Sequence, residues 1–345
     1  MNRAPLVFVI VVNYNGVKYL KTCLSSLEQQ TYRNYRIIML DNASTDNSVE
    51  FTSKNFPKIY IVQEKKNYGF AKGNNLTIKF ALDQKADYVF LVNNDTEVER
   101  DLLEKLVSAA EGEKSIGIVG PAVFDLKNKC SVQELGMAVD RFGYPLAIKS
   151  MSEKKACVFF VSGCAMLVKS ELFCKIGLFD EKYFMFAEDL DFCWRGRLSG
   201  YKIIVVEAAK IYHASGGSIS GGVIKGATYK TNVKRIFLRE KNTIRTLIKN
   251  YEPSSIIKVI PFYMALLLFE SIFWLCLLKP NITKNILKAI WWNIKYLPDT
   301  IRQRVIVQSL RKISDKEIAA IMLPGYCKLS IFQSVGVPSL VDSQK

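Results

Sequence analysis

The chain of 345 residues has a single histidine, and its eight cysteines include no CxxC pair. Scattered cysteines in a chain of this length predict neither a disulfide framework nor a structural zinc site. Cys157 and Cys164 stand in apolar runs, where a thiol packs as a small core residue, so we expect a reducing, cytoplasmic environment. The run VFVIVV near the N-terminus is short and ends in a polar turn, which indicates a buried first strand rather than a signal peptide.

Two common nucleotide-binding motifs are also missing, because the sequence has neither GxGxxG nor a Walker A loop. Their absence weakens the case for dinucleotide binding and for P-loop hydrolysis. The stretch 67–75, NYGFAKGNN, instead opens a predicted helix with two glycines and Lys72. Backbone N–H groups at such a helix start can meet a phosphate, and Lys72 adds charge. The alternative is that the glycines only allow the turn.

Acidic residues are scarce in the last third of the chain. Residues 225–328 hold 19 Lys and Arg against six Asp and Glu, so this segment carries +13 of the net charge of +16. A basic surface suits nucleic acid or an anionic membrane. The 20-residue apolar stretch Val259–Leu278 favours lipid, although Pro261 and Glu270 weaken a transmembrane assignment. We expect membrane attachment, and a buried core or dimer helix is the alternative.

The first 120 residues alternate apolar strands with helical patterns, as a doubly wound, mostly parallel α/β sheet requires. Near-continuous runs of Val, Ile, Leu and Phe predict strands that are buried on both faces. The predicted strands are 6–12, 35–40, 59–62, 87–92 and 116–119. The predicted helices are 17–29, 46–54, 71–84 and 101–111.

Three regions are expected along the chain. Residues 1–224 form the α/β catalytic domain, in which 121–155 is a turn-rich variable stretch. Residues 225–300 form a basic and hydrophobic helical region that associates with membranes. Residues 301–345 form a basic C-terminal tail, whose last part, 330–345, looks loosely ordered.

Polar residues follow several predicted strands, and such residues should converge because ligands of open parallel sheets bind beyond the carboxyl ends of the strands. Asp95, closing NND after one strand, is placed to hold Mg²⁺ or Mn²⁺ against a diphosphate. Asp41, closing another, could accept hydrogen bonds from a base or a ribose. Taken singly, Asp95 is better explained as part of a strand-ending turn, and Asp41 could equally serve as an N-cap or in an Asx-turn.

An acidic cluster follows the aromatic run YFMF. Glu188, Asp189 and Asp191 crowd the start of a predicted helix, where the helix dipole alone would favour them. A carboxylate that the aromatic residues shield from water would have a raised pKa and could serve as general base. His213 follows a strand and could bind a metal or a phosphate, although a lone histidine is more often structural.

The series of motifs resembles family 2 glycosyltransferases with the GT-A fold, and in particular their rhamnosyltransferase-like branch. The matching stretches are VVNYNG, DNASTDNS, NYGFAKGNN, LVNNDTEV, SGCAMLV, FDEKYFMFAEDLDFCWRGRLSGYKI and IYHASGGS. The resemblance covers roughly residues 5–250. It implies a donor site beside the base, ribose and diphosphate of a nucleotide-sugar, formed by Tyr14, Asn15, Asp41, Gly69, Lys72, Asn75 and Asn94.

The resemblance also implies the roles of the chemical groups. Asp95 would belong to the equivalent of the DxD metal motif, with His213 as a further metal contact. Asp189 would be the catalytic base and Glu188 its neighbour. The sequence departs from the family pattern at Asn93, where a strict DxD motif has Asp, so the metal dependence of the chain is open.

The resemblance therefore implies an inverting glycosyltransferase that uses Mg²⁺ or Mn²⁺ and a UDP- or dTDP-sugar. Rhamnose would be one candidate sugar, and the acceptor would be a hydroxyl of a glycan or polyprenyl-linked molecule in surface polysaccharide or glycoprotein synthesis. We expect it at the cytoplasmic face of an anionic membrane, peripheral or single-pass, without nucleic acid as a partner. The alternatives are a nucleotidyltransferase that makes nucleotide-sugars and a non-catalytic, basic nucleic-acid-binding protein.

Overall fold

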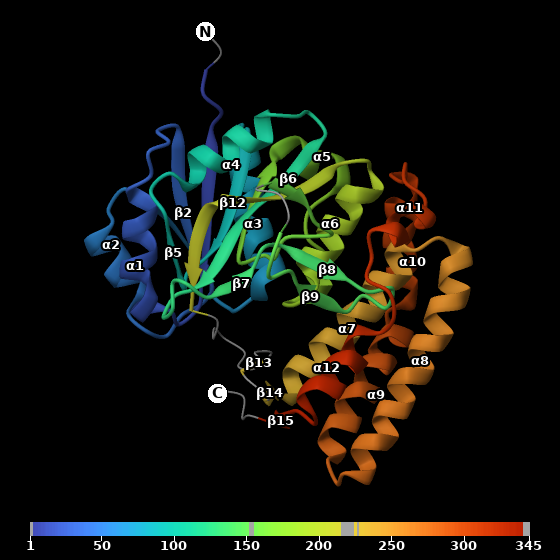
Figure 1. The fold of residues 1–345 in the computed structure, drawn as a ribbon. Coiled ribbons are helices and arrows are strands. Elements are labelled where there is room, and N and C mark those ends of the chain that lie inside the picture. Colours follow the sequence, from blue (N-terminus) through green and yellow to red (C-terminus); the bar gives the residue numbers. More distant parts are fainter. Residues whose placement is uncertain (1–2, 152–154, 215–223, 226–227, 341–345) are drawn as a thin grey trace. The chain divides into compact units, whose positions relative to one another are not determined.

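The computed structural model describes residues 3–151, 155–214, 224–225 and 228–340 (Figure 1). The chain divides into two compact units. The first holds residues 1–137 and 147–215, and the second holds 138–146 and 216–345. Residues 138–146 thus interrupt the first unit and belong to the second. The limits at 225 and 301 that the sequence suggested stay predictions.

The first unit is built on one large sheet. Its strands in chain order are β1 Val7–Asn13, β2 Tyr35–Asp41, β3 Tyr60–Gln63, β4 Tyr88–Asn93, β5 Thr96–Val98, β6 Ile116–Asp125, β7 Val132–Glu134, β10 Lys155–Cys157, β11 Ala165–Lys169 and β12 Lys202–His213. The order across the sheet is β10-β12-β6-β11-β4-β1-β2-β3, with β5 beside β12 and β7 beside β6. β1 runs parallel to β2 and β4, β2 to β3, and β6 to β12, whereas β11 runs antiparallel to β4 and β6.

Helices cover both faces of this sheet. Alternate side chains of β1 point to opposite faces, and the apolar side chains on both faces are buried against helices. Val7, Val9 and Val11 share one hydrophobic core with the apolar faces of two helices, while Phe8 meets Phe80 of a third helix edge to face. The helices are α1 Val17–Glu28, α2 Ser48–Asn55, α3 Gly69–Asp83, α4 Leu102–Glu111, α5 Ser170–Ile176, the 3-10 turn η1 Glu181–Tyr183, and α6 Glu188–Leu198. The predicted doubly wound, mostly parallel fold is confirmed.

The topology gathers strand ends at one edge. β1, β2 and β4 are parallel and in register, with Asn13 opposite Asp41 and Val12 opposite Asn93. The residues that follow these strands must therefore lie next to each other. β12 continues to His213 and pairs there with β5, which directly follows Asp95.

The second unit is mainly helical. Its helices are α7 Val233–Asn250, α8 Pro253–Cys276, α9 Pro280–Lys295, α10 Leu297–Ser309, α11 Asp315–Ala320 and α12 Cys327–Val335. The short strands near it are β8 Met137–Val139 and β9 Pro145–Ala147, which pair with each other, and β13 Ile224–Lys225, β14 Thr228–Thr231 and β15 Ser339–Leu340. The prediction of a loosely ordered end at 330–345 is wrong for its first part, because α12 continues to Val335.

A cluster of charges joins three helices of the second unit. The Lys328 ammonium group on α12 lies 2.9 Å from Glu240 on α7 and 2.6 Å from Glu270 on α8. The hydroxyl group of Tyr263, also on α8, donates to Glu240. Glu270, which made the apolar stretch look unsuited to a membrane, therefore has a partner within its own unit.

Among the described residues, α8 is the one helix that is long and apolar enough to cross a membrane, and only 22% of its most apolar stretch is buried. Length and composition alone are weak grounds for a span. Its buried residues, Tyr263, Leu267, Ser271 and Trp274, recur at three- and four-residue intervals and so form one face. The opposite face carries exposed apolar side chains, including Phe269 at 70% exposure.

Candidate functional site

A hydrogen-bonded network of side chains occupies the carboxyl edge of β1, β2 and β4. The side-chain amide of the fully buried Asn13 donates to a carboxylate oxygen of Asp41 over 3.1 Å. The amide of Asn94 donates in turn to the side-chain oxygen of Asn13 over 2.7 Å. The structure thus brings Asp41 and Asn94 together, with Asn13 as the bridge between them.

The loop after β1 is tied to the loop after β2. The backbone N–H of Asn15 donates to the Ser44 hydroxyl, and the side-chain oxygen of Asn15 accepts from the backbone N–H of Thr45 over 2.7 Å. Asn15 has a φ of +50°, a conformation that asparagine tolerates better than most residues. Tyr14 beside it stays 36% exposed, so its ring is free to meet a ligand.

The stretch 67–75 packs against the protein more tightly than its sequence indicated. Asn42 holds its start, donating to the Gly69 carbonyl and accepting from the Tyr68 N–H. Gly69 has a φ of +76°, and a Cβ there would lie 2.4 Å from the carbonyl oxygen of Phe184. Glycine is therefore required because another backbone approaches closely, whether or not a phosphate binds nearby.

Two further donor-site residues of this stretch differ in how available they are. Lys72 lies on the surface, 3.5 Å from Glu181, and such an exposed pair is weak. Asn75 is only 2% exposed, and its amide donates to and accepts from the backbone of Phe179 over 2.9 and 3.0 Å. The predicted contact of Asn75 with ribose or diphosphate does not fit this geometry, because both ends of its amide hold the segment that leads to η1.

Asp95 and His213 form a pair at the end of β4. The carboxylate of Asp95 is almost fully buried, and one of its oxygens lies 3.2 Å from Nε2 of His213. Burial by itself would lower the pKa of His213, but the hydrogen bond and charge of Asp95 outweigh it and raise this pKa. The part of the chain that the structure describes contains no group of three or more His, Cys, Asp and Glu side chains suited to a metal. A cation here would need further ligands from a substrate.

Asp189 stands in the first turn of α6, after a strained loop. Phe184, Phe186 and Ala187 have φ values of 64°, 71° and 62°, and left-handed backbone in such residues costs about 1–3 kcal/mol each. Strain of this kind persists where the surrounding structure enforces it, and it is common at functional sites. One carboxylate oxygen of Asp189 accepts from the Gly163 N–H over 2.9 Å. Burial raises the pKa of Asp189, despite the hydrogen bonds that favour its charged form.

Residues 163–164, just before β11, link Asp189 to the pair formed by Asp95 and His213. Gly163 holds Asp189, and the carbonyl of the next residue, Cys164, accepts from the N–H of Asn93 over 2.9 Å. Asn93 begins the turn that carries Asp95. The structure therefore brings Asp189 to the same edge of the sheet as Asp95.

The other acidic residues of α6 are buried. Glu188 is 5% exposed, and Asp191 is fully buried beside Arg195 one turn later, at 3.0 Å. The Arg195 guanidinium also donates to the carbonyls of Ile176 and Leu178. Asp191 therefore stabilises α6 through its ion pair with Arg195. For this residue, the alternative of a purely structural role at the helix start fits.

Two residues of this edge escaped the sequence analysis. Gln133 and Glu134 come from β7, inside the turn-rich stretch 121–155. Gln133 contacts the ring and the backbone of His213, and Glu134 accepts a hydrogen bond from the Ser162 hydroxyl. Burial raises the pKa of Glu134. Single polar residues in a stretch without periodicity gave no signal that could have singled them out.

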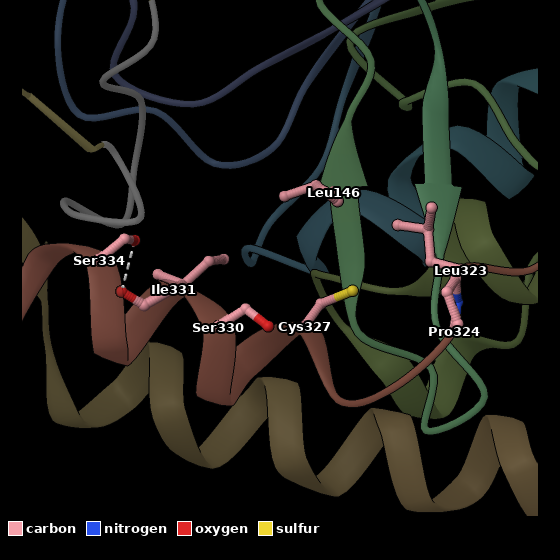
Figure 2. A pocket seen from close by; sticks show the side chains of 7 residues that line it. All are labelled: Leu146, Leu323, Pro324, Cys327, Ser330, Ile331 and Ser334. Carbon is pink, nitrogen blue, oxygen red and sulfur yellow. Dashed lines mark hydrogen bonds between the residues drawn. The ribbon is translucent and has the colours of Figure 1, made fainter.

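The second unit contains a cavity of a different kind (Figure 2). It has a volume of about 330 Å³ and a largely apolar lining, which comes from β9, from residues 323–324 and from α12. The lining residues are Leu146, Leu323, Pro324, Cys327, Ser330, Ile331 and Ser334. It holds no carboxylate or histidine, so it is not a candidate for the chemistry of the first unit.

Several known proteins resemble this chain in sequence. Residues 8–175 match the family model described as glycosyl transferase family 2. N-acetylglucosaminyl-diphospho-decaprenol L-rhamnosyltransferase of Mycobacterium tuberculosis is 26% identical over 230 residues, which cover 59% of this chain and 75% of the relative. The dTDP-rhamnosyl transferase RfbF of Shigella flexneri is 22% identical over 253 residues, which cover 72% of this chain and 81% of RfbF.

Solved structures show the same fold at low identity. Mannosyltransferase PcManGT from Pyrobaculum calidifontis, in complex with GDP-Man and Mn²⁺, aligns with a TM-score of 0.53 at 18% identity, over 85% of this chain and 88% of the other. GalNAc-T7 with UDP, GalNAc and Mn²⁺ aligns with a TM-score of 0.58 at 14% identity. That alignment covers 73% of this chain, which spans about half, 49%, of GalNAc-T7.

These findings favour a transferase over the nucleotidyltransferase and the nucleic-acid-binding protein considered above. The motifs at the strand ends, the sheet that gathers them and the matches to known proteins all point the same way. The chain is an enzyme, a glycosyltransferase with the GT-A fold, which resembles glycosyl transferase family 2 over residues 8–175 and is similar to rhamnosyltransferases.

Proposed function

We propose that the enzyme transfers a sugar from a nucleotide diphosphate to an acceptor hydroxyl in one inverting step. One observation carries the proposal: Asp189, a carboxylate with a raised pKa, lies at the same sheet edge as the Asp95–His213 pair and is linked to it through residues 163–164. A base and a site for the departing diphosphate are the two parts that such a displacement needs.

Asp189 acts as the base in this account. It removes the proton of the acceptor hydroxyl, whose oxygen attacks the anomeric carbon from the face opposite the nucleoside diphosphate. One carboxylate suffices for a single displacement, so no covalent glycosyl-enzyme forms. Glu188 is buried next to it in the first turn of α6.

The donor lies over the strand ends of the first unit. Asp41, held by Asn13, faces the base, and Tyr14 and Asn15 line that end of the pocket. Lys72, whose surface ion pair is weak, turns toward the diphosphate. Gly69 acts through its backbone conformation, and Asn94 acts through its hydrogen bond to Asn13. We assign Asn75 no contact with the donor.

The residues at the end of β4 fit a divalent cation. Adjacent ligands of an octahedral Mg²⁺ or Mn²⁺ with bonds of about 2.1 Å lie about 3 Å apart, and Asp95 and His213 present atoms 3.2 Å apart. Such cations often share their ligands between a few protein groups and substrate phosphates. When bound, the ion would neutralise charge on the departing diphosphate. Asn93, in the place of an Asp, adds no charge to the set.

The names of the relatives guide the choice of substrates. One is named for L-rhamnosyl transfer to N-acetylglucosaminyl-diphospho-decaprenol, and another as a dTDP-rhamnosyl transferase. We therefore favour dTDP-rhamnose as donor over a UDP-sugar, and a polyprenyl-diphosphate-linked glycan as acceptor. Such an acceptor is anchored in a membrane.

The second unit suits peripheral attachment to an anionic membrane at its cytoplasmic face. Large apolar side chains are exposed on α8, α9 and α10, among them Phe269 at 70%, Trp291 at 65% and Val305 at 65%. The exposed charged side chains on these helices are basic, namely Lys258, Lys284, Lys288, Lys295 and Arg302. Apolar and basic side chains on one helical surface bind the lipid interface. The ion pair of Glu270 with Lys328 holds α8 to α12 of the same unit, and in our proposal α8 lies in the interface and does not cross the membrane.

A thermal-shift panel tests the donor and metal parts of the proposal. UDP, dTDP and GDP are each added with and without Mn²⁺, because a ligand that binds only the folded state raises the unfolding temperature. We expect one nucleoside diphosphate, dTDP in our account, to stabilise the protein more with Mn²⁺, and Asp95→Asn to remove the metal-dependent part. No shift with any of them, or a shift that Asp95→Asn leaves intact, would contradict the proposal.

Flotation with vesicles tests the membrane part. The wild type should float with vesicles that contain phosphatidylglycerol and much less with neutral vesicles. A double variant that carries both Phe269→Glu and Trp291→Glu should no longer float. Tyr60→Glu, which changes an exposed aromatic residue of the first unit, serves as the matched control and should still float. Equal flotation of all three proteins would contradict this attachment surface.

A further inference from the structure

Gln133 is held between three polar groups at the edge of the sheet. Its side-chain nitrogen donates to the Asp125 carboxylate over 3.2 Å and to the carbonyl of His213 over 2.9 Å. Both partners are acceptors only, so they fix which end of the amide carries the nitrogen. The side-chain oxygen of Gln133 is then the atom that lies 3.3 Å from Nδ1 of His213.

An amide oxygen can only accept a hydrogen bond, so Nδ1 of His213 must be the donor. A neutral imidazole has one N–H, which leaves Nε2 with a lone pair. That lone pair faces a carboxylate oxygen of Asp95 at 3.2 Å. Two lone-pair atoms this close repel unless a proton or a cation lies between them.

The backbone provides a reason why Gln133 reaches this position. In the pairing of β6 with β7, Val123 lies opposite Glu134 and Phe124 opposite Val132, so Gln133 is an extra residue that stands opposite no residue of β6. Such a β-bulge re-aims a side chain and is frequent beside active sites. Gln133 is thus not needed for the ladder of the two strands.

We propose that Gln133 is a positioning residue that holds His213 with its proton on Nδ1 and so presents the Nε2 lone pair to a divalent cation shared with Asp95. The inference rests on the metal part of the proposed function. It adds a residue that no motif of the chain includes, and it assigns Gln133 a role through His213 rather than through contact with substrate. Partners of this kind set the orientation and tautomer of metal-binding histidines.

The single histidine makes the tautomer directly observable, because a protein labelled with ¹⁵N-histidine gives the signals of one imidazole. Spectra are recorded for the full chain with Mg²⁺ and the nucleoside diphosphate that stabilises it most. In the wild type we expect the proton on Nδ1 and a shifted, proton-free Nε2. In Gln133→Leu, which has no acceptor opposite Nδ1, we expect the Nε2–H form that donates to Asp95.

Mn²⁺ affinity, measured by electron paramagnetic resonance, provides a second readout that does not depend on activity. Gln133→Leu should weaken Mn²⁺ binding about 10- to 100-fold. Gln29→Leu, at an exposed glutamine after α1, is the matched control and should behave as wild type.

The outcomes separate the two proposals. If Mg²⁺ leaves the wild-type imidazole unchanged and Mn²⁺ does not bind, the metal site fails, and the role of Gln133 fails with it. If the wild type responds to metal and Gln133→Leu responds equally, with the same tautomer, the metal site stands and the inference is overturned.

Discussion

Asp189 shows how the surroundings of one carboxylate set its chemistry. Burial raises its pKa above the ordinary range, and a base must be deprotonated to accept a proton. The rate should therefore fall as the pH drops through this raised pKa. We expect the acid limb of kcat/KM to lie clearly above about 3.9, the ordinary value for aspartate. An acid limb at or below that value in the wild type would contradict the assignment.

The same shift predicts an effect on stability. Because the pKa of the carboxyl group is higher in the folded than in the unfolded protein, the fold loses stability as the pH rises through the folded pKa, and the full cost is present above it. Asp189→Asn removes the charge and should raise the unfolding temperature at pH 7, while making little difference at a pH below the ordinary aspartate pKa. Glu207→Gln, at an exposed position of β12, is the control. A lower unfolding temperature for Asp189→Asn would contradict this view.

The loop that precedes α6 and the start of α3 depend on each other. Gly69 lets α3 begin against the backbone of Phe184, where the Phe70 N–H donates to the Phe184 carbonyl over 2.7 Å. Gly69→Ala should destabilise the first unit by more than the roughly 1–2 kcal/mol that a left-handed alanine costs, because its Cβ would also clash with that carbonyl.

A matched glycine separates the two effects. Gly177 has a φ of +77°, nearly that of Gly69, but a Cβ there would meet nothing within 4 Å. Gly177 has a ψ of 176°, a backbone conformation that essentially only glycine adopts, so urea unfolding of Gly177→Ala should show a backbone cost without a clash. A greater loss in Gly69→Ala then sets a lower bound on the clash. Equal losses in the two variants would mean that the approach of Phe184 is not tight.

The elements of the first 120 residues could be predicted because each has its own local pattern. The apolar runs that end at Asn13 and Asp41 form buried strands, and β4 and α4 also lie within about a residue of their predicted bounds. Distant contacts were not predictable in this way. Asn75 looked like a donor contact, but it binds Phe179, about a hundred residues later, and Gln133 reaches the site through a bulge that leaves no periodic signal.

At the scale of the whole molecule, composition indicated that the last third differs from the rest, but not how its charges are arranged. Lys328 compensates Glu240 and Glu270 on two other helices, and this pairing across α7, α8 and α12 has no counterpart in local sequence. The charge of Lys328 lowers the pKa of Glu240 against the effect of burial. The charges of Glu240 and Glu270 raise the pKa of Lys328, again against burial.

Lys328→Met should destabilise the second unit by about 3 kcal/mol, because it leaves two partly buried carboxylates without a cation. Adding Glu240→Gln and Glu270→Gln should recover much of the loss. Circular dichroism during urea unfolding checks both variants. A triple variant that is no more stable than Lys328→Met would show that the charges act independently.

The central claim for the molecule is that Asp189 is the base of an inverting transfer and does not hold the donor. The most direct measurement compares sugar transfer from dTDP-rhamnose to a polyprenyl-diphosphate-linked N-acetylglucosamine by the wild type and by Asp189→Asn, with the donor-induced thermal shift measured on the same samples. The account predicts a loss of about 10²- to 10⁴-fold in rate, an unchanged thermal shift and an inverted anomeric centre in the wild-type product. A transfer rate in Asp189→Asn close to that of the wild type would contradict it.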